Sequence, residues 1–136
     1  MPRSHQALIL AANAALFSEG NLDAVPEFFA TGYVAHLTGG TMRGGHDAIR
    51  RVVAAIKRSF PDLRCDVEIL VESKDRIAWQ RTLRGVQQVA FKGFPSKGKK
   101  LLWRDMVTSR IEDGLIAEEW VVTDFAERLL LAQKSA

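Results

Sequence analysis

Residues 101–124 read LLWRDMVTSRIEDGLIAEEWVVTD and contain two runs in which apolar and polar residues alternate. A period of two is typical of strands that bury one face, so the pattern predicts strands over Leu101–Ile111 and Leu115–Asp124. Asp113-Gly114 lies between the two runs, and Asp-Gly is the strongest short-range signal for a two-residue hairpin turn. The segment is therefore predicted to form an antiparallel hairpin.

Two further segments precede this hairpin and show the same alternation. The alternating positions are Cys65, Val67, Ile69 and Val71 in the first segment and Ile77, Trp79, Arg81 and Leu83 in the second. Both segments are predicted to be strands of the same sheet.

Helical spacing of apolar residues dominates the N-terminal half of the chain. It predicts one helix over 4–17, a second that starts after Asn21 or Asp23 and runs through Phe28 and Phe29, and a third that opens at His46-Asp47 and stops before Pro61. Residues 32–45 are rich in Gly and Thr and are predicted to be irregular. A last helix is expected over 125–133. Helices followed by antiparallel strands predict an α+β fold, in which helices pack on a strongly curved, mostly antiparallel sheet around an apolar pocket.

The overall composition indicates an ordinary globular protein. The chain of 136 residues is predicted to form a single domain over 1–136, with 47% hydrophobic residues, 26% charged residues and a net charge of +3. Basic and acidic residues are interleaved, which argues against nucleic acid as a partner. No apolar run approaches the length of a membrane span, and Asn13 interrupts the apolar run after Arg3 that could mimic a leader. A lone Cys65 fits a reducing compartment, so a cytoplasmic location is expected.

Several short motifs occur along the chain in a fixed order: Tyr33–His36, Gly45–Ile49, Phe60–Leu63, Asp75–Ala78, Gly93–Lys99, Arg110–Gly114, Glu119-Trp120 and Asp124. Their order resembles the SnoaL-like polyketide cyclase family, within the cone-shaped fold shared with nuclear transport factor two and ketosteroid isomerase. The resemblance covers nearly the whole chain. The fold hosts unrelated activities, so the resemblance does not by itself define the reaction.

The resemblance implies ring closure of a polyketide by an intramolecular aldol step, with an acidic residue as acid/base and without a metal or organic cofactor. It also implies that the His and Asp of characterised cyclases fall at Val107 and Val121 in this sequence. Relatives commonly pair through the outer face of the sheet, so a homodimer is expected, with the apolar residues Leu102, Met106 and Val121 as outward candidates.

If the hairpin pairs regularly from its turn, one face of the two strands combines aromatic and acidic residues. That face would carry Trp103, Asp105, Val107, Ser109 and Ile111 on the first strand and Ile116, Glu118, Trp120, Val122 and Asp124 on the second. A bulge would reverse the assignment. The predicted catalytic residues are Asp124, His36 and Asp105, and the predicted substrate-binding residues are Trp120, Trp103, Tyr33, Trp79, Arg81 and Val107.

Structural roles compete with these assignments. Asp124 could cap the last helix, Asp105 could pair with Arg81, His36 could be a surface residue, and the tryptophans could belong to the core. Gly93–Lys99 has the spacing of a phosphate-binding loop, but Lys100 and a strand follow it, so a hairpin loop near the pocket mouth is predicted instead. No set of residues has the spacing of a metal site.

Three functions are consistent with these features. The first is a cofactor-independent enzyme that moves protons on a small hydrophobic carbonyl compound, by ring closure or isomerisation. The second is a non-catalytic domain that binds a small molecule and has lost the cyclase dyad, as Val107 and Val121 suggest. The third is epoxide hydrolysis by Asp105, Arg81 and Asp124.

Overall fold

The computed structural model describes residues 3–134 and confirms the α+β architecture. Its elements are α1 (His5–Asn13), the π-helical turn η1 (Ala14–Ser18), the 3-10 turn η2 (Leu22–Ala24), α2 (Val25–Phe28), β1 (Phe29–Leu37), β2 (Gly40–Met42), α3 (Gly45–Ser59), β3 (Arg64–Glu72), β4 (Arg76–Val86), β5 (Lys100–Glu112), β6 (Leu115–Thr123) and α4 (Phe125–Lys134). The strands form one six-stranded sheet in the order β2-β1-β6-β5-β4-β3. All neighbours are antiparallel except β1 and β6, which are parallel.

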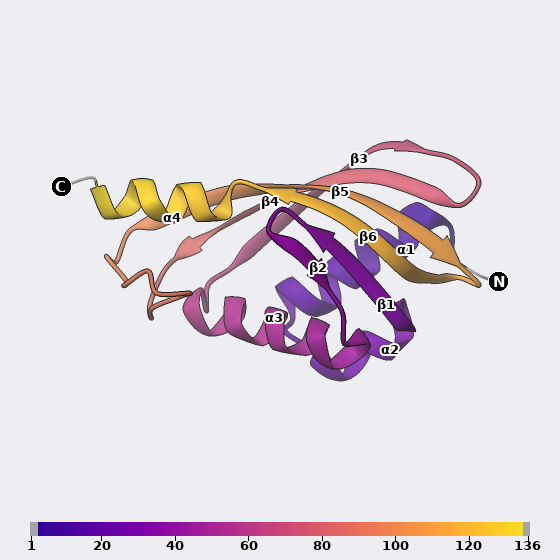
Figure 1. Ribbon diagram of the computed structural model, residues 1–136, viewed down its shortest axis with the longest axis horizontal. Coiled ribbons are helices and arrows are strands. Elements are labelled where there is room, and N and C mark those ends of the chain that lie inside the picture. The colour runs from indigo at the N-terminus through magenta and orange to yellow at the C-terminus, as the bar shows by residue number, and fades with distance from the viewer. Residues whose placement is uncertain (1–2, 135–136) are drawn as a thin grey trace.

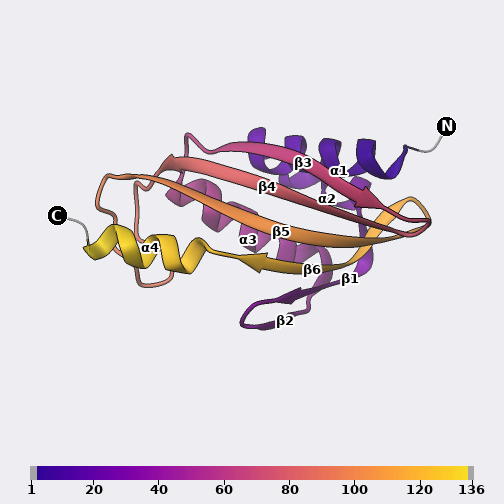
Figure 2. The same ribbon diagram turned by 90° about the horizontal axis from the view of Figure 1, so that it is seen from above.

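The sheet curls over the helices without closing into a barrel (Figure 1). Helices α1, α2 and α3 lie on its concave side, and α4 continues beyond the end of β6. Figure 2 shows the long strands β3 to β6 crossing above α1 and α3. Helix α3 buries Ile49 and Val53 and leaves Arg51 and Arg58 exposed, as its apolar spacing predicted. Within residues 3–134 no helix is both long and apolar enough to cross a bilayer.

The prediction that residues 32–45 are irregular is wrong, because part of this segment forms β1 and β2. Phe29, which was assigned to the second helix, is already the first residue of β1. Tyr33 and Ala35 on this strand are buried, but Gly32 and the exposed residues around it hide the alternation. The main partner of β1 is β6, from the other end of the sequence. Since no local pattern reports such a pairing, the strand could not be recognised from its own residues.

The predicted hairpin is confirmed, with a register shift next to its turn. Asp113 and Gly114 both have positive φ angles, 53° and 76°, as a tight two-residue turn requires. Glu112 then pairs with Leu115, and Ile111 with Ile116, but Arg110 pairs with Glu118. Ala117 is therefore the extra residue of a β-bulge, and from there the two faces of β6 are exchanged relative to regular pairing.

The backbone conformation at Gly45, the first residue of α3, leaves no room for a side chain. Its φ angle is +55°, and a Cβ atom at this position would lie 2.5 Å from the carbonyl oxygen of Thr31 on β1. Replacing Gly45 by alanine is expected to lower the free energy of unfolding by about 2 kcal/mol, because a left-handed conformation costs an L-residue about 1–2 kcal/mol even without the clash. Urea denaturation measures the change. Gly39→Ala is the control, because nothing lies within 4 Å of a Cβ there; equal losses in the two variants would contradict the prediction.

Candidate functional site

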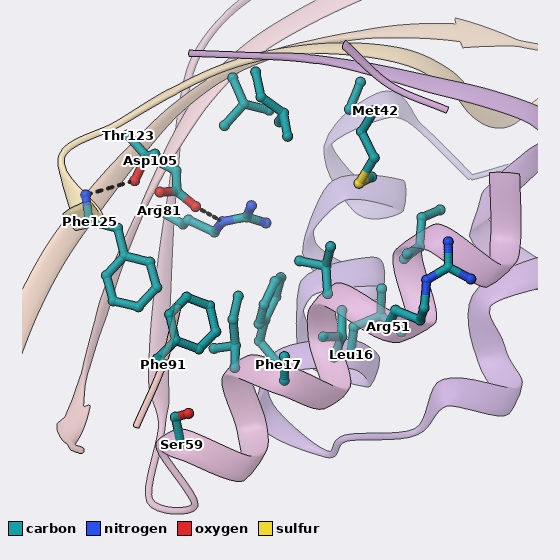
Figure 3. Close-up of a pocket in the computed structure, with 18 of the residues that line it drawn as sticks. Leu16, Phe17, Met42, Arg51, Ser59, Arg81, Phe91, Asp105, Thr123 and Phe125 are labelled. Carbon is teal, nitrogen blue, oxygen red and sulfur yellow. Dashed lines mark hydrogen bonds and ion pairs between the residues drawn. The ribbon is translucent and has the colours of Figure 1, made fainter. Parts of the chain in front are cut away.

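A cavity of about 510 Å³ lies between the concave face of the sheet and α3, with apolar side chains over most of its wall. Figure 3 shows it bounded by α3 and η1 on one side and by β4, β5 and β6 on the other. Its lining residues include Phe17, Phe29, Tyr33, Val53, Ile56, Phe91, Trp103, Val121 and Phe125. The volume falls in the range of pockets that enclose a small organic molecule.

Four of the predicted site residues line this cavity. Tyr33, Arg81, Trp103 and Asp105 reach it from β1, β4 and β5. The Trp103 ring is stacked on Phe125, with ring centroids 4.1 Å apart, so the start of α4 closes one end of the cavity. Residues 90–92 of the loop between β4 and β5 also line it, whereas Gly93–Lys99, the part of this loop predicted to lie near the pocket mouth, do not.

Two further predicted residues belong to the core. Val107 is buried and pairs with Val121 across the hairpin, but only Val121 lines the cavity. Trp79 is buried and does not line the cavity, and its Nε1 donates a hydrogen bond to Ser109 Oγ over 2.9 Å. Because Val121 lines the cavity, it faces inward, although it was expected on the outer face.

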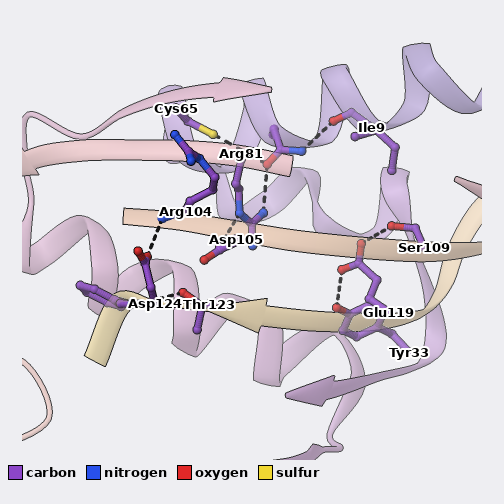
Figure 4. A network of polar contacts seen from close by, with 12 residues as sticks. Ile9, Tyr33, Cys65, Arg81, Arg104, Asp105, Ser109, Glu119, Thr123 and Asp124 are labelled. Carbon is purple, nitrogen blue, oxygen red and sulfur yellow. Dashed lines mark hydrogen bonds and ion pairs between the residues drawn. The ribbon is translucent and has the colours of Figure 1, made fainter. Parts of the chain in front are cut away.

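The structure does not place Asp124 in the cavity. Its carboxylate accepts hydrogen bonds from the backbone N–H of Arg104 (2.8 Å) and from Arg128 Nε (3.1 Å), so it joins the end of β6 to β5 and to the first turn of α4. Figure 4 shows it turned away from the pair formed by Arg81 and Asp105. The set Asp105, Arg81 and Asp124 required for the epoxide hydrolase hypothesis is consequently not assembled.

His36 and Trp120 lie on the outer face of the sheet, which corrects the prediction for both. The bulge at Ala117 turns Trp120 outward, and the pairing of His36 with Trp120 places the histidine on the same side. The two rings are stacked at 5.3 Å, and His36 Nε2 lies 2.6 Å from Glu118 Oε2. Neither ring lines the cavity.

The cavity floor holds a buried ion pair. Arg81 Nε donates to Asp105 Oδ2 over 2.7 Å, and Arg81 Nη1 donates to Asn13 Oδ1 over 3.0 Å. Burial alone would lower the pKa of the guanidinium, but the charge and hydrogen bond of Asp105, with smaller contributions from Cys65 and Glu119, raise its pKa overall. Nη2 has no hydrogen-bond partner among the described residues, and Figure 3 shows the guanidinium pointing into the cavity.

A second buried acid, Glu119, lies beside this pair, and sequence reasoning did not assign it to the site. Both of its oxygens accept hydrogen bonds: Oε1 from the Tyr33 hydroxyl over 2.6 Å and Oε2 from the Ser109 hydroxyl (Figure 4). Burial is the largest influence on its pKa and raises it, aided by the charge of Asp105; the hydrogen bonds from Ser109 and Tyr33 and the charge of Arg81 lower it by less. The net pKa of Glu119 is above that of an ordinary glutamic acid.

Tyr33 is affected by the same environment. Burial, followed by the charge and hydrogen bond of Glu119, raises the pKa of its phenol well above the usual value. Tyr33 therefore keeps its proton and acts as a hydrogen-bond donor, because its phenol is a very weak acid. The arrangement presents a proton acceptor, a phenolic donor and a guanidinium at one end of an apolar cavity, and this is what removal of a proton beside a carbonyl group requires.

The register of β6 relative to its turn determines which of Glu118 and Glu119 faces the cavity. Regular pairing places Glu118 inside and Glu119 outside, and the bulge at Ala117 reverses them. Ile116 and Ala117 are adjacent and both buried, which is incompatible with strict alternation. The adjacent apolar residues Ile116 and Ala117 at the start of the strand were thus the available indication of the bulge.

Comparisons with known proteins agree with this fold. IdmH from Streptomyces antibioticus, a candidate polyketide cyclase, superposes with a TM-score of 0.82 at 24% identity, covering 96% of this chain and 99% of its own. A SnoaL-like polyketide cyclase from Agrobacterium tumefaciens gives 0.79 at 21% identity, covering 98% and 99%. AclR from Streptomyces galilaeus, a candidate hydroxylase, gives 0.79 at 23% identity, covering 96% of each chain. At these identities the likeness concerns the fold.

The sequence itself matches the family profile of the SnoaL-like polyketide cyclases over residues 7–132. None of the curated proteins compared with the chain is similar enough to count as a match. The profile spans most of α1 and α4 and all the elements between them, which includes every residue of the cavity. This chain belongs to the SnoaL-like polyketide cyclase family.

Proposed function

We propose that this protein is a cofactor-independent enzyme that transfers protons on a small apolar carbonyl compound bound in the cavity, leading to aldol ring closure or isomerisation. The observation that carries the proposal is the position of Glu119, a buried acid on the cavity wall with a raised pKa, next to the guanidinium of Arg81. A carboxylate with a raised pKa is a stronger base toward carbon than an exposed one.

The proposed reaction starts with the carboxylate of Glu119 and a carbon next to a carbonyl group. Glu119 takes the proton, and the C–H electron pair moves into the carbonyl to form an enolate. Arg81 Nη2 donates a hydrogen bond to the enolate oxygen, where negative charge develops. The enolate carbon then attacks a second carbonyl of the same molecule, and the resulting alkoxide takes the proton back from Glu119. In isomerisation the proton returns to a different carbon.

Each neighbour of Glu119 has a role in this scheme. Tyr33 and Ser109 orient the carboxylate by occupying one lone pair on each oxygen. Asp105 holds Arg81 in place, because its carboxylate binds Nε and leaves the outer edge of the guanidinium toward the cavity. The aromatic and aliphatic wall excludes water, which strengthens the electrostatic contribution of Arg81.

The alternative of a non-catalytic binding domain rests on Val121. The resemblance places the acid of the cyclase dyad at this position, and here an apolar side chain lines the cavity. The proposed enzyme therefore uses a different acid, two residues earlier on the same face of the same strand. The alternative would retain the cavity and its ligand without any proton transfer.

Hydrogen–deuterium exchange at carbon distinguishes the proposed enzyme from a non-catalytic binding domain. Small 1,3-dicarbonyl and aryl ketone compounds are incubated with the protein in D₂O, and deuterium incorporation next to the carbonyl is followed by mass spectrometry. We expect exchange above the buffer rate for at least one compound that binds. Because only the ionised carboxylate accepts a proton, the rate should fall on the acidic side, with a midpoint above the usual pKa of glutamic acid. Binding of several such compounds without any accelerated exchange would overturn the proposal in favour of the binding domain.

His36→Ala and Asp124→Asn are the matched controls for this assay. Both remove a titratable group that the structure places outside the cavity, so the exchange rate should stay within about twofold of the wild type. If either variant lost as much of the exchange rate as a cavity variant, the catalytic residues would lie on the outer face or at the end of β6 instead.

A further inference from the structure

The opening of the cavity carries an excess of positive charge. Arg51 and Arg58 on α3 and Lys92 on the loop after β4 line the cavity and are exposed to solvent. These three residues are referred to here as the basic rim. The acids on the cavity wall, Asp105 and Glu119, are both buried at its floor. The wall therefore separates charge: the exposed cations lie at the entrance, and the acids lie at the floor together with Arg81.

The two rim arginines differ from the other cations on α3. Arg50 donates to Asp47 Oδ1 over 3.0 Å and to the carbonyl oxygen of Leu22, and Lys57 donates to the carbonyl oxygen of Phe17 over 3.0 Å. Within residues 3–134, by contrast, neither Arg51 nor Arg58 has a carboxylate within ion-pair distance. Arg51 and Arg58 are seven positions apart, which is about two helical turns, so they lie on one side of the helix.

Exposed apolar side chains also line the cavity. Leu37 on β1 and Val52 on α3 line the cavity and are 42% and 41% exposed, respectively. Apolar walls of low polarisability strengthen the field of nearby charges on an incoming molecule. A ligand that matches this opening has an apolar body and an anionic group at one end.

At the floor, a permanent anionic group on the ligand would be less favourable than the transient charge of an enolate oxygen bound by Arg81. Asp105 already compensates the charge of Arg81, and the raised pKa of Glu119 shows that its surroundings resist negative charge. A negative group on the ligand is therefore more stable at the rim, and the reacting carbonyl group is then the part that reaches Arg81 and Glu119.

We infer that the ligand carries an anionic group, a carboxylate or a phosphate, at the end that faces out of the cavity, and that Arg51, Arg58 and Lys92 bind this group. The inference specifies the substrate class and rests on the proposed function, because it assumes that the cavity holds the substrate. It assigns the basic rim a role in selection and orientation, separate from the proton transfer at the floor.

Ligands that share a shape and differ in charge test this inference. Binding of 2-naphthoate, 2-naphthyl phosphate and the neutral 2-naphthamide is measured by calorimetry at low salt, together with the corresponding anthracene compounds. At least one anion in each ring series should bind about tenfold more tightly than the amide, since a contact between opposite charges near a protein surface provides that much. The preference should decrease in 0.5 M NaCl, because salt at this level screens exposed charges.

Variants then assign the preference to the rim. In Arg51→Gln/Arg58→Gln, and further with Lys92→Gln, the anions should bind as weakly as the amide, while the affinity for the amide stays the same. Arg64→Gln/Lys74→Gln removes two exposed cations that do not line the cavity, so it controls for net charge and should retain the preference. A carboxylate preference would indicate a free acid, and a phosphate preference would indicate a phosphorylated ligand; either supports the inference.

Three results would overturn the inference: equal binding of anions and amides, a preference that survives in the triple rim variant, or no binding by any anion of either ring size at millimolar concentration. The exchange assay is independent of all three. Discrimination without exchange would keep the anionic ligand and refute the proposed chemistry, and exchange without discrimination would do the reverse.

Discussion

The Arg81→Met variant is expected to lose about 3–5 kcal/mol of the free energy of unfolding, because it leaves Asp105 buried without its counter-charge. Asp105 is 7% exposed, and Arg81 Nε is the cation that binds it, over 2.7 Å. The same substitution releases Asn13 Oδ1 from Arg81 Nη1 and removes the guanidinium from the face of the Phe17 ring. Methionine retains the apolar stem, so lost volume contributes little. Chemical denaturation measures the change.

Two further variants separate this explanation from a general effect of removing an arginine. Arg84 lies on β4 like Arg81, and Arg84→Met breaks its ion pair with Asp66 on β3. The two side chains of that pair are 39% and 66% exposed, so the loss should stay below about 1 kcal/mol. Arg81→Met/Asp105→Leu removes both buried charges and should recover most of the stability. Equal losses in Arg81→Met and Arg84→Met, or no recovery in the double variant, would show that the buried pair is not what matters.

The Glu119→Gln variant is expected to lower the rate of proton exchange at carbon by about 100- to 10,000-fold, the usual contribution of a positioned acid/base group. Glutamine has nearly the same shape and accepts the hydrogen bond from Tyr33, but it cannot take a proton at neutral pH. Binding of the carbonyl compound should change little, because the cavity wall is intact. The substitution should therefore slow the chemical step, so the lower exchange rate should persist at saturating concentrations of the carbonyl compound.

The adjacent acid provides the control. Glu118 lies on the outer face, bonded to His36 and Arg110, so Glu118→Gln should retain the wild-type rate. Stability supplies a second criterion. The pKa of Glu119 is raised on folding, so its contribution to stability is present at low pH and is lost as the pH rises through the folded value. Glu119→Gln should accordingly be as stable as the wild type in acid and more stable above that value. A low rate together with a large loss of stability would instead indicate a structural defect.

The sequence was most informative where neighbouring residues determine the structure. The turn at Asp113-Gly114, the strands on either side of it and the limits of α3 follow from backbone preferences and from periodicity, both of which act within a few residues. The motif order also indicated the family, since it depends only on residues and their spacing. These features predicted the α+β fold, and they placed Tyr33, Arg81, Trp103 and Asp105 at the cavity.

What the sequence left undecided depends on contacts between distant segments. One extra residue at Ala117 exchanges the faces of β6, so the tertiary pairing with β5 and β1 determines that Glu119 faces the cavity and that Trp120 faces away. Alternation has a period of two, and a shift by one residue therefore inverts every later side chain without any trace in local propensity. Strand β1 was missed for a related reason, because its pairing partner β6 is remote in the sequence. The pattern of residues thus determined the fold and its family by itself, whereas the identity of the buried acid was decided by strand register, which only packing of the whole sheet specifies.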